Sequence, residues 1–150
     1  MNHQELKALD SAHTLQTYGR FDVDIDHGQG ATLWDLSGRK YIDFTSGIGV
    51  CSVGYGNPRW AKAIYDQALK LGHISNLFYS QPYARLADTL CTRTGMAAAF
   101  FGNSGAEANE GLIKLGRKYS FDKYGQGRST IITLNNSFHG RTITTLTATG

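Results

Sequence analysis

The segment around Ser104 carries residue types that could bind an anion. Ser104 precedes Glu107 by three positions, which is the spacing of a capping box: the hydroxyl should accept the N–H of Glu107, while the carboxylate accepts the N–H of Ser104. A helix is therefore predicted to begin at Gly105. The first-turn amides, at Gly105 and Ala106, have no partner within a helix and lie at its positive end, so they could bind a phosphate. A well-capped structural helix is the alternative.

The same segment lacks the known nucleotide fingerprints. The run G-N-S-G-A-E-A-N-E, at 102–110, contains no Gly-Lys-Ser/Thr and no three-glycine spacing. It is therefore neither a P-loop nor a dinucleotide-binding turn. A phosphosugar- or nucleotide-binding module that uses the same helix end in another way stays open.

A second group of chemically capable residues follows an apolar, β-branched run at 130–134. It consists of Phe138, His139, Gly140 and Arg141, which are an aromatic residue, a titratable ring, a glycine and an arginine. Taken singly, Phe138 could be a core residue and Arg141 a surface residue. Together at the end of a strand they favour a binding site.

These two groups need elements that bring them together. The apolar run 97–101, the helix from Gly105 and the run 130–134 predict a β-α-β unit with a right-handed parallel crossover. Ligands gather at the carboxyl ends of such strands, so 138–141 should lie on the same edge as the helix start. An apolar stripe should dock the helix on the sheet. Its members are Ala108, Leu112, Leu115 and Tyr119.

The alternation of apolar and polar residues at 21–25 predicts a strand. The polar positions here are Asp22, Asp24 and Asp26, which could suggest a calcium loop. The sixth loop position is His27 rather than glycine, and the twelfth is Leu33 rather than glutamate. We therefore expect no metal site.

Further elements are predicted from turn and cap residues. The runs 31–36 and 40–44 should form an antiparallel hairpin around Gly38. The run 47–50 should be a glycine-rich loop, which could approach a ligand or simply connect two elements.

Two helices should follow this loop. Asn57 and Pro58 predict a helix that ends near Leu71. A second helix should begin after Pro82. Residues 1–14 could form a weak helix or be disordered.

Composition limits the function classes. The chain has 150 residues, of which 41% are hydrophobic, so it can form a domain with its own core. Its net charge of +3 comes from 15 basic and 12 acidic residues without a basic block, which does not favour nucleic acid or an anionic membrane. Cys51 and Cys91 form no zinc or disulfide framework. Without a signal-like or membrane-length apolar run, we expect a cytoplasmic protein.

Four ordered motifs together carry a family resemblance. They are G-A-T-L-W-D-L-S-G-R-K-Y-I-D-F (30–44), S-N-L-F (75–78), N-S-G-A-E-A-N-E (103–110) and F-H-G-R-T (138–142). From about Tyr18 onward the chain resembles the class III pyridoxal-phosphate-dependent aminotransferases of fold type I. The resemblance implies an α/β fold, in which 1–46 contributes an antiparallel segment to the small domain and 47–150 begins the large cofactor-binding domain.

The resemblance also implies roles for individual residues. Ser104, Gly105 and Ala106 would hold the phosphate of pyridoxal 5'-phosphate, and Phe138 would stack on its ring. Arg141 would bind a substrate carboxylate through its planar fork. No catalytic role in proton transfer is assigned to His139.

The family's chemistry also needs a lysine that binds the cofactor covalently and a carboxylate at the pyridine nitrogen. By resemblance both are expected downstream of Gly150, so no catalytic residue is expected in this chain, which alone should not turn over substrate.

The chain departs from the family pattern in the segment 54–58, where many members have a histidine before the proline.

Within the class, the resemblance implies transfer of the δ-amino group of N-acetylornithine to 2-oxoglutarate, in arginine biosynthesis, by a cytoplasmic homodimer without nucleic-acid or membrane partners. Ornithine, succinylornithine and 4-aminobutyrate are alternative donors, because each also carries a carboxylate for Arg141. A truncated, non-catalytic scaffold or dimerisation piece is a further alternative.

Overall fold

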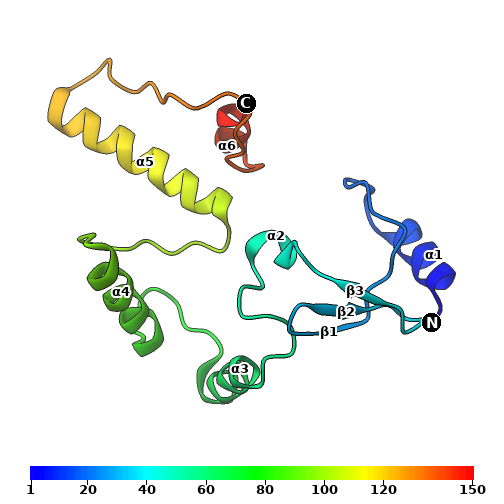
Figure 1. Cartoon of the computed structure of the whole chain (residues 1–150). Helices are drawn as coiled ribbons and strands as arrows, with labels where there is room; N and C mark the ends of the chain where they lie inside the picture. Colours follow the sequence, from blue (N-terminus) through cyan, green and yellow to red (C-terminus); the bar gives the residue numbers. More distant parts are fainter. The chain divides into compact units, whose positions relative to one another are not determined.

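The computed structural model describes residues 1–150 (Figure 1). They form two compact units, Met1–Ser75 and Asn76–Gly150. The predicted boundary after residue 46 concerns the domains of a complete enzyme and stays a prediction. No helix of the chain is both long and apolar enough to cross a membrane.

A three-stranded antiparallel sheet organises the first unit. Its strands are β1 (His27–Gln29), β2 (Thr32–Trp34) and β3 (Lys40–Ile42), in the order β1-β2-β3. The predicted hairpin is confirmed, with Leu33 opposite Tyr41, although both strands are shorter than expected.

Asp35 holds the turn between β2 and β3. Its Oδ1 accepts the N–H groups of Ser37 and Arg39, both at 2.9 Å, and its Oδ2 accepts the hydroxyl of Tyr41 at 2.8 Å. The hydroxyl of Ser37 also donates to Oδ1, at 2.7 Å, and this bond is the main reason that the pKa of Asp35 is lowered to about 2. Gly38 adopts φ +84°, which explains why glycine stands in this turn.

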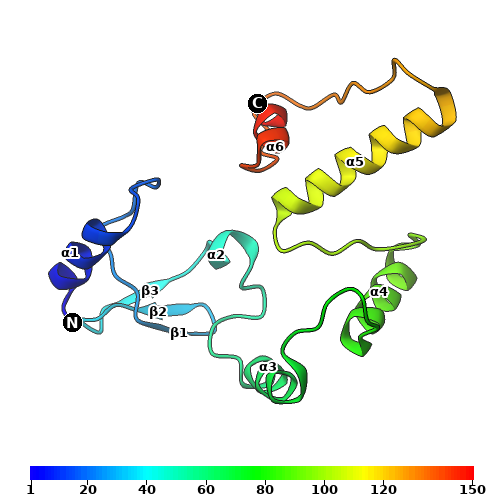
Figure 2. The ribbon, with the colours of Figure 1, turned by 180° about the vertical axis from the view of Figure 1, so that it is seen from behind.

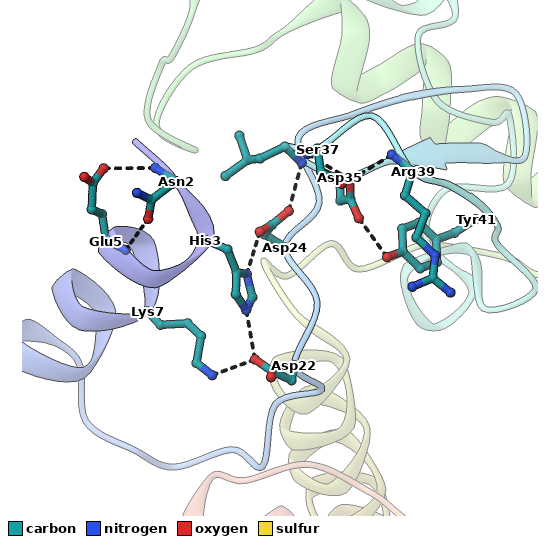
Figure 3. A network of polar contacts seen from close by, with 11 residues as sticks. Asn2, His3, Glu5, Lys7, Asp22, Asp24, Asp35, Ser37, Arg39 and Tyr41 are labelled. Carbon is teal, nitrogen blue, oxygen red and sulfur yellow. Dashed lines mark hydrogen bonds and ion pairs between the residues drawn. The ribbon is translucent and has the colours of Figure 1, made fainter.

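The strand predicted at 21–25 is wrong, because this segment pairs with a helix through its side chains and has no ladder partner. Helix α1 (His3–His13) is capped reciprocally by Asn2 and Glu5, which decides between helix and disorder. His3 of α1 lies between two carboxylates: Nδ1 contacts Asp24, and Nε2 lies 2.9 Å from Asp22 (Figure 3). Asp22 and Asp24 thus serve the contact with α1, whereas Asp26 pairs with His27.

The run 47–50 was predicted as a loop and largely forms the short element α2 (Ser46–Gly49). Gly47 and Ile48 both have φ 62°, so α2 is a left-handed turn and not a regular α-helix. A positive φ is unusual for the β-branched Ile48. After the turn, Tyr55 pairs with Gly30 in an antiparallel bridge.

Both predicted helices form: the cap at Asn57 is confirmed, and the second helix begins at Gln81, before the predicted start. Helix α3 (Pro58–Leu71) begins after Asn57, whose side chain accepts the N–H groups of Arg59 and Trp60 at 3.0 and 3.1 Å. Helix α4 (Gln81–Thr94) has its proline in the first turn and ends at Gly95 in the left-handed conformation.

The second unit is built around α5 (Gly105–Tyr124), which packs against α6 (Ile143–Ala148), a helix that the sequence analysis did not predict. After α5 the chain runs back along the helix to reach α6 (Figure 2). The predicted β-α-β unit does not form: 97–101 and 130–134 join no sheet, and Ile132 and Leu134 are 93% and 80% exposed. A strand requires a neighbour for its backbone groups, and this unit provides none.

The predicted docking stripe of α5 is also wrong. Leu112 and Leu115 are 66% and 67% exposed, and the buried residue of the helix is Ile113. The helix buries the side that faces α6 and the segment before it, because no sheet lies against the expected stripe.

Candidate functional site

The start of α5 is capped as predicted on one side. The hydroxyl of Ser104 accepts the N–H of Glu107 at 3.2 Å. The Glu107 carboxylate returns to the N–H of Asn103 and not to that of Ser104, which corrects the predicted capping box. The bonds from Asn103 are the main reason that the pKa of Glu107 is lowered.

The next two amides remain available. Gly105 and Ala106 are the first residues of α5, and neither N–H donates to an acceptor in the protein. A Cβ added to Gly105 would meet no atom within 4 Å, so the space beside it is open. Two unpaired amides at the positive end of a 20-residue helix form a suitable position for a phosphate group.

The segment 138–142 lies against the first two turns of α5. The Asn109 side chain donates to the backbone carbonyl of His139 at 2.8 Å. Gly140 packs on Ala106 so closely that an added Cβ would lie 2.6 Å from the Ala106 Cβ. The predicted closeness of this segment to the helix start is therefore confirmed, although packing on the helix and not a shared sheet edge creates it.

Phe138 and Arg141 lie together on this segment. The Arg141 guanidinium carbon is 5.3 Å from the centroid of the Phe138 ring, a cation–π distance. The Phe138 side chain is 66% exposed. Both side chains are thus accessible, with an aromatic face and a fork of donors side by side.

The His139 ring is held by a neighbour. Ser137 donates its hydroxyl to the carbonyl of Leu134 at 2.6 Å, so its oxygen must accept from Nε2 of His139 at 3.0 Å. The proton on Nε2 is thereby fixed, which agrees with a structural role for this ring.

Sequence reasoning missed a polar cluster beneath this segment. The Thr142 hydroxyl donates to Glu110 at 2.6 Å and lies 2.6 Å from the hydroxyl of Thr145, which is fully buried. The available signal was the spacing of Ala106, Asn109, Glu110 and Ile113, which places two polar residues on one helical face with two apolar ones.

The comparisons with known proteins agree with this architecture. The family model "Aminotransferase class-III" matches residues 15–150, and the chain belongs to that family. The acetylornithine aminotransferases of Haemophilus ducreyi and Wolinella succinogenes are 58% and 57% identical over 150 and 146 residues, or 100% and 96% of this chain. The chain spans 38% and 37% of the length of these two relatives.

Solved structures show the same fold. The ornithine aminotransferase of Toxoplasma gondii superposes with a TM-score of 0.89 at 28% identity, over 97% of this chain and 35% of its own. The acetylornithine aminotransferase of Elizabethkingia anophelis gives 0.79 at 31% identity, over 85% and 33%. The predicted fold class, the first part of a fold type I aminotransferase, is confirmed. A further structure of the Toxoplasma enzyme describes pyridoxal phosphate at its active site.

Proposed function

We propose that this chain forms the phosphate- and carboxylate-binding part of a pyridoxal-phosphate-dependent aminotransferase. The observation that carries the proposal is the pair of unpaired amides at Gly105 and Ala106, with Phe138 and Arg141 on a segment packed against the same helix. Membership of the class III family supports it.

The residues of the chain fit the cofactor. The amides of Gly105 and Ala106, with the hydroxyl of Ser104, would hold the phosphate. Phe138 has one face near Arg141 and would offer the other to the pyridine ring. The chemistry that pyridoxal phosphate supplies when bound is an electron sink for amino-group transfer.

Arg141 would orient the substrate through its carboxylate, because a guanidinium fork matches two carboxylate oxygens. No residue here is assigned to proton transfer or to the covalent bond with the cofactor. We place those roles in the remainder of the full-length protein.

The proposed reaction is transfer of the δ-amino group of N-acetylornithine to 2-oxoglutarate, in arginine biosynthesis. The names of the two bacterial relatives at 58% and 57% identity support this donor. Ornithine is the second candidate, supported by the Toxoplasma structure at 28% identity. We also propose that the complete protein works in the cytoplasm as a homodimer.

The test uses the full-length protein that contains this segment. Purified with pyridoxal phosphate, it should form glutamate from 2-oxoglutarate faster with N-acetylornithine than with ornithine, succinylornithine or 4-aminobutyrate, and the 150-residue chain alone should form none. A full-length protein that does not bind pyridoxal phosphate would overturn the proposal. A preference for another donor would overturn only the substrate assignment.

A further inference from the structure

Two anchors fix the segment around Arg141 to α5. Asn109 donates to the carbonyl of His139, and Glu110 accepts the hydroxyl of Thr142. The anchors lie on adjacent residues of one helix, four and five positions after Gly105. Arg141 therefore lies between two bonds to the helix that also carries the free amides.

The hydrogen bond between Thr142 and Glu110 has a defined donor and acceptor. The Thr142 hydroxyl has one proton, which goes to the Glu110 carboxylate at 2.6 Å. The oxygen of the Thr145 hydroxyl accepts the N–H of Thr142 at 3.1 Å, and its proton has two acceptors on Thr142, the hydroxyl at 2.6 Å and the carbonyl at 3.2 Å. Every hydroxyl proton in this relay has an acceptor.

The hydrogen bonds among Glu110, Thr142 and Thr145 hold the segment at 138–142 firmly against α5. Thr145 is fully buried, and the Glu110 pKa is lowered mainly by the bond from Thr142, so the carboxylate accepts as an anion. Gly140 packs closely against Ala106 and Thr145, since an added Cβ would lie 2.6 Å from both the Ala106 Cβ and the Thr145 Oγ1. The backbone from His139 to Thr142 is thus held at both ends and in the middle.

We propose that Glu110, through Thr142, is a positioning residue that sets the place of Arg141 relative to the phosphate-binding amides, and that the bond from Asn109 to His139 assists it. This inference rests on the proposed function, because it assigns a purpose to the Arg141 position. Loss of the anchor should weaken binding of the substrate carboxylate and leave the phosphate site intact.

The test compares three variants of the full-length protein: Thr142→Val, Thr142→Ser and Thr147→Val. Thr142→Val keeps the shape of the side chain but removes the proton that Thr142 donates to Glu110. Thr142→Ser keeps the hydroxyl. Thr147→Val is the matched control, because the Thr147 hydroxyl bonds only to the carbonyl of Ile143 in its own helix.

We expect Thr142→Val to raise the KM for N-acetylornithine about tenfold, as loss of a hydrogen bond to a charged group predicts. Its kcat and its Kd for pyridoxal phosphate, measured by titration of the apoprotein, should stay within about twofold of wild type. Thr142→Ser and Thr147→Val should resemble wild type in all three. Hydrogen exchange of the apoprotein should become faster at 138–142 in Thr142→Val and stay unchanged at the start of α5.

The outcomes separate the two proposals. If wild type fails to bind pyridoxal phosphate, the proposed function is wrong, and the exchange rates alone decide whether the anchor exists. If wild type is active and Thr142→Val matches Thr147→Val, the positioning role is wrong. A Thr142→Val protein that loses cofactor affinity and substrate affinity together would show a merely structural role and also contradict it.

Discussion

Gly140 and Ala106 are in direct backbone contact: a Cβ on Gly140 would lie 2.9 Å from the Cα of Ala106. Gly140 also has φ +133°, a conformation that residues with a side chain rarely adopt. Close approach and backbone conformation thus both require glycine between Phe138 and Arg141.

Gly140→Ala should destabilise the protein, since overpacking and the unfavourable φ each cost about 1–3 kcal/mol. The measurement is urea unfolding of the full-length protein. Gly116→Ala is the control, because a Cβ at this position in α5 meets nothing within 4 Å and alanine favours a helix. Equal midpoints for the two variants would show that the contact does not constrain the segment.

Ser104→Ala should lower the stability of the protein and also weaken its binding of pyridoxal phosphate. Loss of the N-cap bond to Glu107 should cost about 1 kcal/mol of stability. Loss of a hydroxyl beside the phosphate should raise the Kd for pyridoxal phosphate about tenfold. Asn57→Ala removes the corresponding cap of α3 and should lower stability alone. An unchanged Kd in Ser104→Ala would remove this hydroxyl from the proposed site.

Arg141→Lys should keep the positive charge and lose the planar fork. We expect the KM for a carboxylate-bearing donor to rise about tenfold or more, with little change in the Kd for pyridoxal phosphate. Arg93→Lys, in the last turn of α4, serves as the matched control. If the two variants bind the donor equally well, Arg141 does not bind its carboxylate.

The contact of α1 with the segment before β1 should depend on pH. His3 has a carboxylate oxygen at each ring nitrogen, so both nitrogens carry protons, and the bonds that they donate, first to Asp22 and then to Asp24, raise the His3 pKa above 6.5. Lys7 also faces Asp22 at 2.6 Å. The stabilisation is fully present below pH 6.5 and is lost as the pH rises through the raised pKa.

Hydrogen exchange of the α1 amides, measured across this pH range, tests the contact. Protection should fall with rising pH in wild type after correction for the intrinsic exchange rate, and His3→Gln should remove that dependence. His13→Gln, at the other end of α1, should behave like wild type. A pH dependence that survives in His3→Gln would assign the effect to another group.

Local signals predicted the starts of α3 and α5. Asn57 and Ser104 carry their capping information within three residues, so α3 and α5 begin where the sequence indicates. Long-range partners could not be predicted in this way. Thr142 bonds to Glu110 across 32 positions, and His3 bonds to Asp24 across 21.

The strand predictions failed for a related reason. Alternating or apolar residues show only that a segment could join a sheet, while a strand forms when another segment satisfies its backbone groups. The hairpin of β2 and β3 contains its own partner and was predicted. The runs 97–101 and 130–134 contain none, and they remain outside any sheet.

Helix α5 fixes the distance between the phosphate-binding amides and the segment that carries Arg141. The free amides and the two anchors of the Arg141 segment are separated by a few residues of one helix, whose length per residue is fixed at about 1.5 Å by its hydrogen bonds. If α5 tilted during turnover, the phosphate-binding amides and the Arg141 segment would move together. The distance between the two binding points would then stay the same.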